Sequence, residues 1–448
     1  MTSHQNQLNI KNLFIGGAAW TFIGFGVSQI IRLASSVLLA RLLAPEDYGL
    51  ISIVTVIYIG ISLMSDIGIG QNILQSHRGD DEDFLNAAWS LQIVKGWIVW
   101  LVCILISYPA SIFYGQPILF PLIVVSTFSA VIGGYNSSGV YTTERRIDLK
   151  QQTIYQVFSQ AVALVVMLII ANIHPTVWAL VIGGLTSTAI YTYLTHKLVP
   201  MKNKFNWDKE IIQSLVHFGK WILFSSALGF IVSHSSSLIL GKFLTMSSLG
   251  LFSIGVTLSR VVETIHSTIA AKVILPVYTK INHLDTHEKR KRLVKLKLAM
   301  MGLFLPVLWV LTVFASDIVG LIFDPRYQGA SWILQLYSLA YIPMIISGLG
   351  SFYVVMGDTK LLAQLTVTKT IIFFSTVFLG WKLNGADGII LGIACSTFFN
   401  YFVELYAQRI YGVWLTKIDL LGFISSAIII GLAYSFTNRL DSLALHFI

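Results

Sequence analysis

The sequence predicts an all-α polytopic membrane protein: two six-helix bundles related by a pseudo-two-fold axis along the membrane normal, plus about one extra C-terminal transmembrane helix. Three observations predict it. Hydrophobic residues make up 55% of the chain and charged residues only 11%, whereas soluble domains carry about 25% charged residues. Apolar runs recur along the chain at lengths that suit a bilayer. A segment near the N-terminus is echoed 201 residues later.

Each apolar run is a candidate membrane span, because a helix crosses the hydrocarbon core in about 20 residues. The first run is too long for a removable signal peptide and contains Arg32. Twelve runs form two sets of six, and a thirteenth lies near the C-terminus: 13–40, 48–74, 86–108, 117–142, 152–172, 176–195, then 215–240, 249–275, 296–322, 331–356, 361–382, 387–408, and last 418–436.

The echo indicates two similar halves. A shift of 201 places Trp20 on Trp221, and residues 49–52 (GLIS) on residues 250–253 (GLFS). With six spans each, both halves enter the membrane in the same direction, an arrangement typical of transporters. We therefore expect an N-terminal bundle at 1–200, a C-terminal bundle at 201–412, and an extra helix and tail at 413–448.

The net charge of +9 follows the membrane topology and does not indicate nucleic-acid binding. With the N-terminus in the cytoplasm, 19 Lys and Arg residues fall in inner loops and five in outer loops, a clear positive-inside bias. Loops 143–151, 196–214 and 281–295 should then be cytoplasmic, and 109–116 and 324–330 external. The basic stretch 287–297 fits either an interfacial amphipathic helix or a solvated loop.

Charged residues inside the spans are the main functional candidates, since each costs about 2.5–3.5 kcal/mol to insert. Arg32 and Lys369 have no acidic residue three or four positions away, which favours a place in a cavity. Arg260 and Glu263 could pair along one helix or bind substrate, and Asp66 could pair locally or act in function. The remaining mid-span charge is Lys95, and the charges nearest the inner ends, expected to reach the membrane surface, are Lys220, Lys272 and Glu404.

Polar residues share helical faces with these charges. Gln29 lies on the face of Arg32, Gln156 lies in the fifth span, and the repeat places Asp66 opposite Ser267. Arginine binds phosphate oxygens through two parallel hydrogen bonds, so the set suits an anionic, polar substrate. The predicted cavity residues are Arg32, Arg260, Lys369, Glu263, Asp66, Gln29 and Gln156.

Signatures of other chemistries do not occur in the sequence. It has no phosphate-binding loop of the Gly-x-x-x-x-Gly-Lys-Ser/Thr type, no Cys/His cluster with metal spacing and no nucleophile elbow. Cys103 and Cys395 lie in apolar runs, which implies no disulfide framework. We expect no catalytic residue, no metal and no cofactor, and thus a protein that is not an enzyme.

Four connecting segments carry a family resemblance: residues 40–50 (ARLLAPEDYGL), 66–75 (DIGIGQNILQ), 144–150 (ERRIDLK) and 321–330 (LIFDPRYQGA). Together, in this order, they resemble the bacterial polysaccharide exporters, also called oligosaccharide or O-antigen flippases. That family belongs to the superfamily of the multidrug extrusion pumps and the peptidoglycan lipid flippase. The resemblance extends over residues 10–410. Members have twelve core spans, often with two more, whereas this chain has one extra.

The resemblance implies a function. Such proteins move undecaprenyl-pyrophosphate-linked oligosaccharide repeat units across the bacterial inner membrane for surface polysaccharide assembly, by alternating access driven by an ion gradient. The implied partners are the lipid-linked oligosaccharide, H⁺ or Na⁺ as coupling ion, membrane lipids and the polysaccharide polymerase machinery, with no nucleic acid.

Two alternatives are weighed against this function. A multidrug or metabolite exporter of the extrusion type favours acidic residues in an apolar cavity, whereas basic residues predominate here. A membrane polysaccharide polymerase or ligase needs a sizeable outer loop with catalytic residues, and the predicted outer connections are short.

Overall fold

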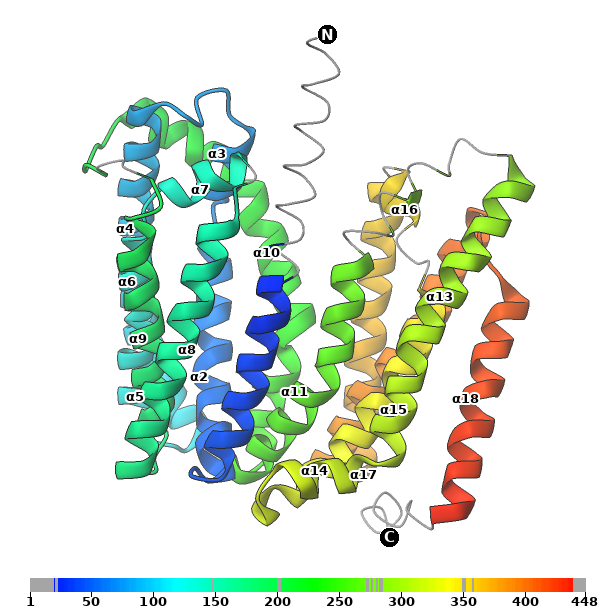
Figure 1. The fold of residues 1–448 in the computed structure, drawn as a ribbon. Helices are drawn as coiled ribbons and strands as arrows, with labels where there is room; N and C mark the ends of the chain where they lie inside the picture. The colour runs from blue at the N-terminus through cyan, green and yellow to red at the C-terminus, as the bar shows by residue number, and fades with distance from the viewer. Residues whose placement is uncertain are drawn as a thin grey trace. The chain divides into compact units, whose positions relative to one another are not determined.

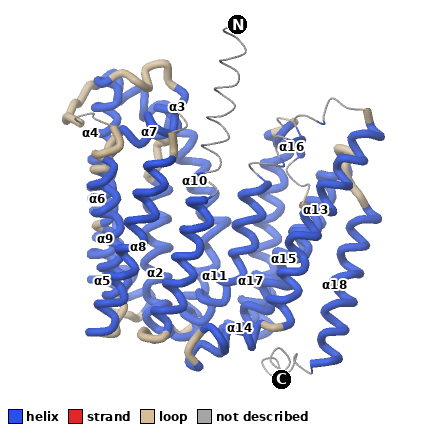
Figure 2. Tube along the Cα trace, in the orientation of Figure 1, coloured by secondary structure: helices blue, strands red, loops and turns tan. Residues whose placement is uncertain are grey.

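The computed structural model describes residues 20, 23–146, 148–199, 203–270, 274, 277–278, 281, 285–348, 352–356 and 358–437. Every regular element in this part of the chain is helical (Figures 1 and 2). Nine of the described helices are long and apolar enough to cross a membrane, or ten if the bent pair Leu119–Gly134 and Gly139–Arg145 forms one span. The predicted all-α, multi-pass membrane class is therefore confirmed.

The chain divides into two compact units, Met1–Ser247 and Ser248–Ile448. This boundary lies later than the predicted one at 200/201, because helix α10 (Lys209–Phe243) packs against helices α2 and α4 of the first unit. Helix α2 begins at Pro45 and α11 at Met246, which reproduces the 201-residue offset of the sequence repeat. The pseudo-two-fold axis itself stays a prediction.

Unit 1 contains interrupted helices where the sequence predicts continuous ones. The run 48–74 is interrupted between α2 and α3, where Gly68 precedes α3 in a left-handed conformation with a φ of 61°. The run 117–142 bends by 65° between α6 and α7. The helices are Ile23–Ala40, α2 (Pro45–Met64), α3 (Ile69–Gln75), α4 (Glu82–Tyr114), α5 (Leu119–Thr127), α6 (Ser129–Gly134), α7 (Gly139–Arg145), α8 (Lys150–Ile173), α9 (Trp178–Thr195) and α10.

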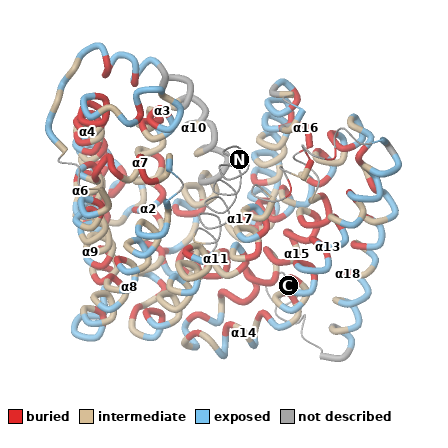
Figure 3. The backbone as a smooth tube through the Cα atoms, turned by 45° about the horizontal axis from the view of Figure 1, so that its top comes forward, coloured by how far each residue is buried: buried red, intermediate tan, exposed pale blue. Residues whose placement is uncertain are grey.

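Unit 2 is built around α15, along which buried residues are concentrated (Figure 3). Helices α13, α14, α17 and α18 all pack against α15. The run 296–322 divides into α13 and the separate short helix α14. The elements are α11 (Met246–Ile269), α13 (Thr286–Val313), α14 (Ala315–Ile322), the 3₁₀ turn η2 (Pro325–Ala330), α15 (Ser331–Ser347), α16 (Phe352–Val355), α17 (Thr359–Ile410) and α18 (Thr416–Thr437).

The basic stretch 287–297 forms the start of α13, so neither a separate interfacial helix nor a solvated loop is present there. The Asp285 side chain caps this helix by accepting a hydrogen bond from the Glu288 N–H at 3.2 Å. Its basic turns continue directly into the apolar part of the span.

Helix α17 consists of two antiparallel halves, which agree with the predicted spans 361–382 and 387–408. They join at Asn384 and Gly385, whose backbone is non-helical, with a φ of 56° at Gly385. Glycines allow the halves to approach closely, because a Cβ on Gly380 would overlap the Gly388 carbonyl. Small residues are typical of helix contacts in membranes.

Large apolar side chains lie on the outside of both units. Leu105 of α4 is 74% exposed and Leu321 of α14 is 84% exposed. Such residues would be costly in water, but hydrocarbon tails are as apolar as leucine. Exposed apolar surface along the helices is therefore what a protein surrounded by lipid requires.

Candidate functional site

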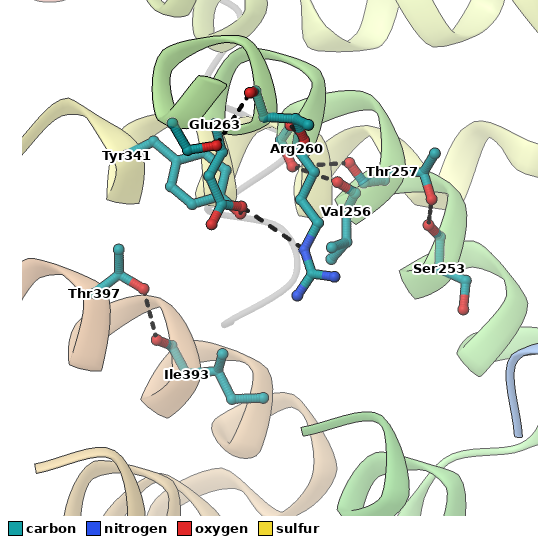
Figure 4. A network of polar contacts seen from close by, with 12 residues as sticks. Ser253, Val256, Thr257, Arg260, Glu263, Tyr341, Ile393 and Thr397 are labelled. Carbon is teal, nitrogen blue, oxygen red and sulfur yellow. Dashed lines mark hydrogen bonds and ion pairs between the residues drawn. The ribbon is translucent and has the colours of Figure 1, made fainter. Parts of the chain in front are cut away.

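In unit 2, Arg260, Glu263 and Tyr341 form a polar cluster on α11 and α15 (Figure 4). The Tyr341 hydroxyl donates a hydrogen bond to Glu263 Oε2 at 2.9 Å. Arg260 Nε lies 3.9 Å from the same oxygen, and the Arg260 side chain is 49% exposed. An ion pair at that distance and exposure contributes little. Glu263 is thus held by Tyr341, while the Arg260 guanidinium keeps most of its donors available.

Lys369 differs from its prediction as an unpaired cation. Its ammonium forms an ion pair with Glu404, 35 residues away on the other half of α17. Both side chains are largely buried, at 27% and 14% exposed, and Tyr353 is a further electrostatic neighbour of Glu404. Glu404 therefore does not extend to the membrane surface as predicted. Lys272 and the side chain of Lys220 lie outside the described residues.

In unit 1, Arg32, Gln29 and Gln156 lie on two adjacent helices. The first helix contacts α8 closely, because a Cβ on Gly24 would overlap the Thr153 side chain. Arg32 and Gln156 are exposed and Gln29 is half-buried. No ion pair of Arg32 occurs among the described residues, and its place in a cavity stays a prediction.

Asp66 forms an ion pair with Lys95 of α4, whose Nζ donates to Asp66 Oδ1 at 3.0 Å. The same oxygen accepts a hydrogen bond from the Gly68 N–H at 3.2 Å. The structure thus pairs Asp66 and leaves its functional role a prediction. The pairing occurs across helices, at a point where α2 has ended.

A fourth ion pair, absent from the predicted site, lies inside unit 2. Lys297 of α13 and Asp419 of α18 pair while only 1% and 4% exposed, and the Tyr401 hydroxyl donates to Asp419 Oδ2 at 2.9 Å. Sequence reasoning assigned Lys297 to a cytoplasmic loop. The signal that could have found the pair is an acidic residue just inside the last apolar run.

The described residues contain no group of three or more His, Cys, Asp or Glu side chains that could hold a metal ion. The polar groups within the spans are instead ion pairs, tyrosines and amides. Such groups bind and release polar ligands through hydrogen bonds.

The family profile described as "Polysaccharide biosynthesis protein" matches residues 38–332, more than half of the chain. The chain belongs to this family. A relative of similar sequence is the "Lipopolysaccharide biosynthesis protein WzxC" of Escherichia coli (strain K12), 22% identical over 425 residues, covering 91% of this chain and 85% of the relative. An "Uncharacterized membrane protein in cps region" of Klebsiella pneumoniae is 23% identical over 407 residues, covering 89% and 83%.

Solved structures share the fold of this family member. A "Lipid II flippase MurJ" in an inward closed conformation aligns with a TM-score of 0.72 at 14% identity, covering 94% of this chain and 93% of that one. An inward-facing "multidrug resistance MATE family transporter" aligns with a TM-score of 0.63 at 12% identity, covering 89% and 94%. At these identities the likeness shows a common fold, which transporters of different substrates use.

Proposed function

We propose that this protein flips undecaprenyl-pyrophosphate-linked oligosaccharide repeat units across the bacterial inner membrane, for assembly of a surface polysaccharide. The observation that carries the proposal is the family match over residues 38–332. The similarity to a lipopolysaccharide biosynthesis protein and the fold shared with a lipid flippase support it. Transport, not catalysis, is the activity that we assign.

Arg260 is the residue best suited to the pyrophosphate. Its guanidinium is about half-exposed and only loosely paired with Glu263, so two donors can engage one phosphate group. Because Tyr341 also donates to Glu263, the carboxylate keeps one partner when Arg260 turns toward a ligand. Arg32 would act similarly in unit 1, with Gln29 and Gln156 offering amide groups to sugar hydroxyls.

Lys369 enters this function differently. Its ammonium is neutralised by Glu404, so it contributes less to an anion site than a free cation would. We assign Lys369 a place in the protein's internal charge balance and give direct contact with the pyrophosphate to the two arginines.

An ion gradient is the energy source that we propose, because the sequence has no nucleotide-binding loop of the phosphate-binding type. Alternating access of the two halves, coupled to entry of H⁺ or Na⁺, would then drive the lipid across. In vesicles containing the purified protein, collapse of both gradients should abolish net export. Net export at full rate without either gradient would contradict the coupling.

The binding role is tested with Arg32→Gln and Arg260→Gln in cells that lack the native copy. Each should lower surface polysaccharide about tenfold or more, since hydrogen bonds to charged groups contribute about 1.5–3 kcal/mol, while lipid-linked repeat units accumulate on the inner leaflet. Arg290→Gln, at an exposed arginine near the start of α13, is the matched control and should export normally.

The same experiment separates the alternatives. Normal export by both arginine variants, at normal protein levels, would show that the cationic mechanism is wrong. Unchanged polysaccharide in cells lacking the protein, together with increased drug sensitivity, would favour the multidrug exporter instead.

A further inference from the structure

A polar pocket lies inside unit 1, where two membrane helices are interrupted. One interruption separates α2 from α3 at Ser65–Gly68, and the other separates α6 from α7 at Tyr135–Ser138. Helices α3 and α7 pack against each other beside it. Interrupted helices are tolerated at membrane depth where they line a cavity or are buried in protein, and in transporters they commonly form the substrate site.

The pocket has a volume of about 240 Å³, and its lining includes Ser62, Asp66, Gln92, Lys95, Asn136 and Tyr141. We call it the Asp66–Lys95 pocket. Sites for drug-sized ligands measure about 300–1,000 Å³, so this one accommodates a single small ring. Asp66 and Lys95 keep 31% and 24% exposure of their side chains, so a ligand can reach them.

The wall of the pocket is held in place by Gln92. Its Nε2 donates to the carbonyl oxygens of Gly133, Gly134 and Asn136 at 3.2–3.3 Å, and its Oε1 accepts from the Tyr141 hydroxyl at 3.0 Å. These bonds tie Gln92 to the backbone at the break after α6, where the Gly133 carbonyl also accepts from the Asn136 N–H at 3.0 Å. The pocket is therefore preformed, with Gln92 fully occupied by the protein.

The Asp66–Lys95 ion pair, in contrast to Gln92, has donors and acceptors that form no hydrogen bond in the described part of the chain. Lys95 donates one hydrogen bond, to Asp66 Oδ1, which leaves two of its three N–H groups. Within the described residues, Asp66 Oδ2 and the Ser62 hydroxyl have no partner. These free donors and acceptors all border the same pocket.

The pair also gives the pocket no net charge. A phosphate would compete with Asp66 for Lys95, and a metal cation would have to displace the ammonium from the carboxylate. A neutral polyol requires neither, because its hydroxyl groups both donate and accept. We propose that the Asp66–Lys95 pocket binds one sugar ring of the glycan, with Asp66 accepting from neighbouring hydroxyls and Lys95 donating to a hydroxyl or ring oxygen.

This proposal rests on the proposed function, and two lipid probes separate it from that function. Binding of undecaprenyl pyrophosphate is measured on the purified full-length protein with and without one attached N-acetylhexosamine or hexose. Asp66→Asn and Lys95→Gln should weaken binding of the glycosylated probe about tenfold or more, because they remove charged hydrogen-bond partners. Binding of the sugar-free probe should be unchanged, and Arg260→Gln should weaken both.

The control variant is Arg78→Gln, which breaks an exposed ion pair with Asp81 in the same unit and should alter neither affinity. The charge-swapped pair Asp66→Lys/Lys95→Asp tests for a purely structural role. It retains the attraction, so it should restore the thermal stability lost in the single variants but not the sugar-dependent affinity. Equal weakening of both probes, no weakening of either, or full rescue by the swap would overturn the proposal.

If the native protein binds neither lipid, the proposed function fails, and the pocket is tested alone. In a Cys395→Ser background, Ser62→Cys is labelled with a maleimide in the presence of free hexoses, 6-deoxyhexoses and N-acetylhexosamines. Protection by a sugar that disappears with Asp66→Asn would support the sugar site. Absence of protection across the panel would exclude it.

Discussion

At the scale of single residues, burial decides the role of a charge. Arg260 and Lys369 have the same sign and both lie within spans, but Lys369 is 27% exposed and closely paired, whereas Arg260 is 49% exposed and loosely paired. Removing one partner of a buried pair leaves the other charge without compensation. Lys369 therefore contributes to stability, whereas Arg260 remains available to a ligand.

Replacing either partner of the Lys369–Glu404 pair should destabilise the protein. We expect Lys369→Gln or Glu404→Gln to cost about 1–3 kcal/mol, less than for a fully buried pair because both groups retain some solvent. The double variant should recover most of this loss, since neither charge is then left alone. Thermal unfolding of the purified protein measures the stability lost in each variant. A double variant that loses the full sum of the two single effects would show that the residues are not coupled.

At the scale of elements, the C-terminal helix α18 is an integral part of unit 2. It packs against α13 and α15, and its Asp419 pairs with the buried Lys297. Farther along the same two helices, the Trp309 indole N–H donates to the Ser426 hydroxyl at 2.9 Å. These contacts attach α18 over much of its length, so we expect it to move with unit 2.

The Lys297–Asp419 pair should therefore be essential for the stability of unit 2. Asp419→Ala would leave a buried ammonium without its partner, at a cost of about 3–5 kcal/mol, and should sharply reduce the yield of folded protein. Adding Lys297→Met should restore the yield, because an apolar side chain of similar size replaces the unpaired charge. Yield and melting temperature in detergent provide the measurement. Equal losses in the single and double variants would contradict this explanation.

At the scale of the whole molecule, the distribution of basic residues predicts orientation. Arg290, near the start of α13, is expected in the cytoplasm and Arg326 outside, and both are exposed. In a Cys395→Ser background, a membrane-impermeant maleimide should label Arg326→Cys in intact cells. It should label Arg290→Cys only after the cells are opened. The reverse pattern would show that the N-terminus is external.

Sequence alone determined that the elements are membrane-spanning helices, because crossing a bilayer requires about 20 apolar residues whatever the helix contacts. The connecting segments likewise carried the family resemblance, whereas the cavity role of Arg32, Arg260 and Glu263 stays a prediction. The residues at 384–385 also fall between two predicted spans, where α17 changes direction. These properties are local, because each depends on one stretch of the sequence alone.

The partner of each charge and the breaks in the helices were decided only by the tertiary structure. Lys369 pairs with Glu404 at a separation of 35 residues, Lys95 with Asp66 at 29, and Lys297 with Asp419 at 122. No spacing rule within one helix can predict such pairs, because they depend on which helices lie side by side. The interruption after α6 is likewise contacted from a distant part of the chain, because Gln92, more than 40 residues earlier, donates to three carbonyls there.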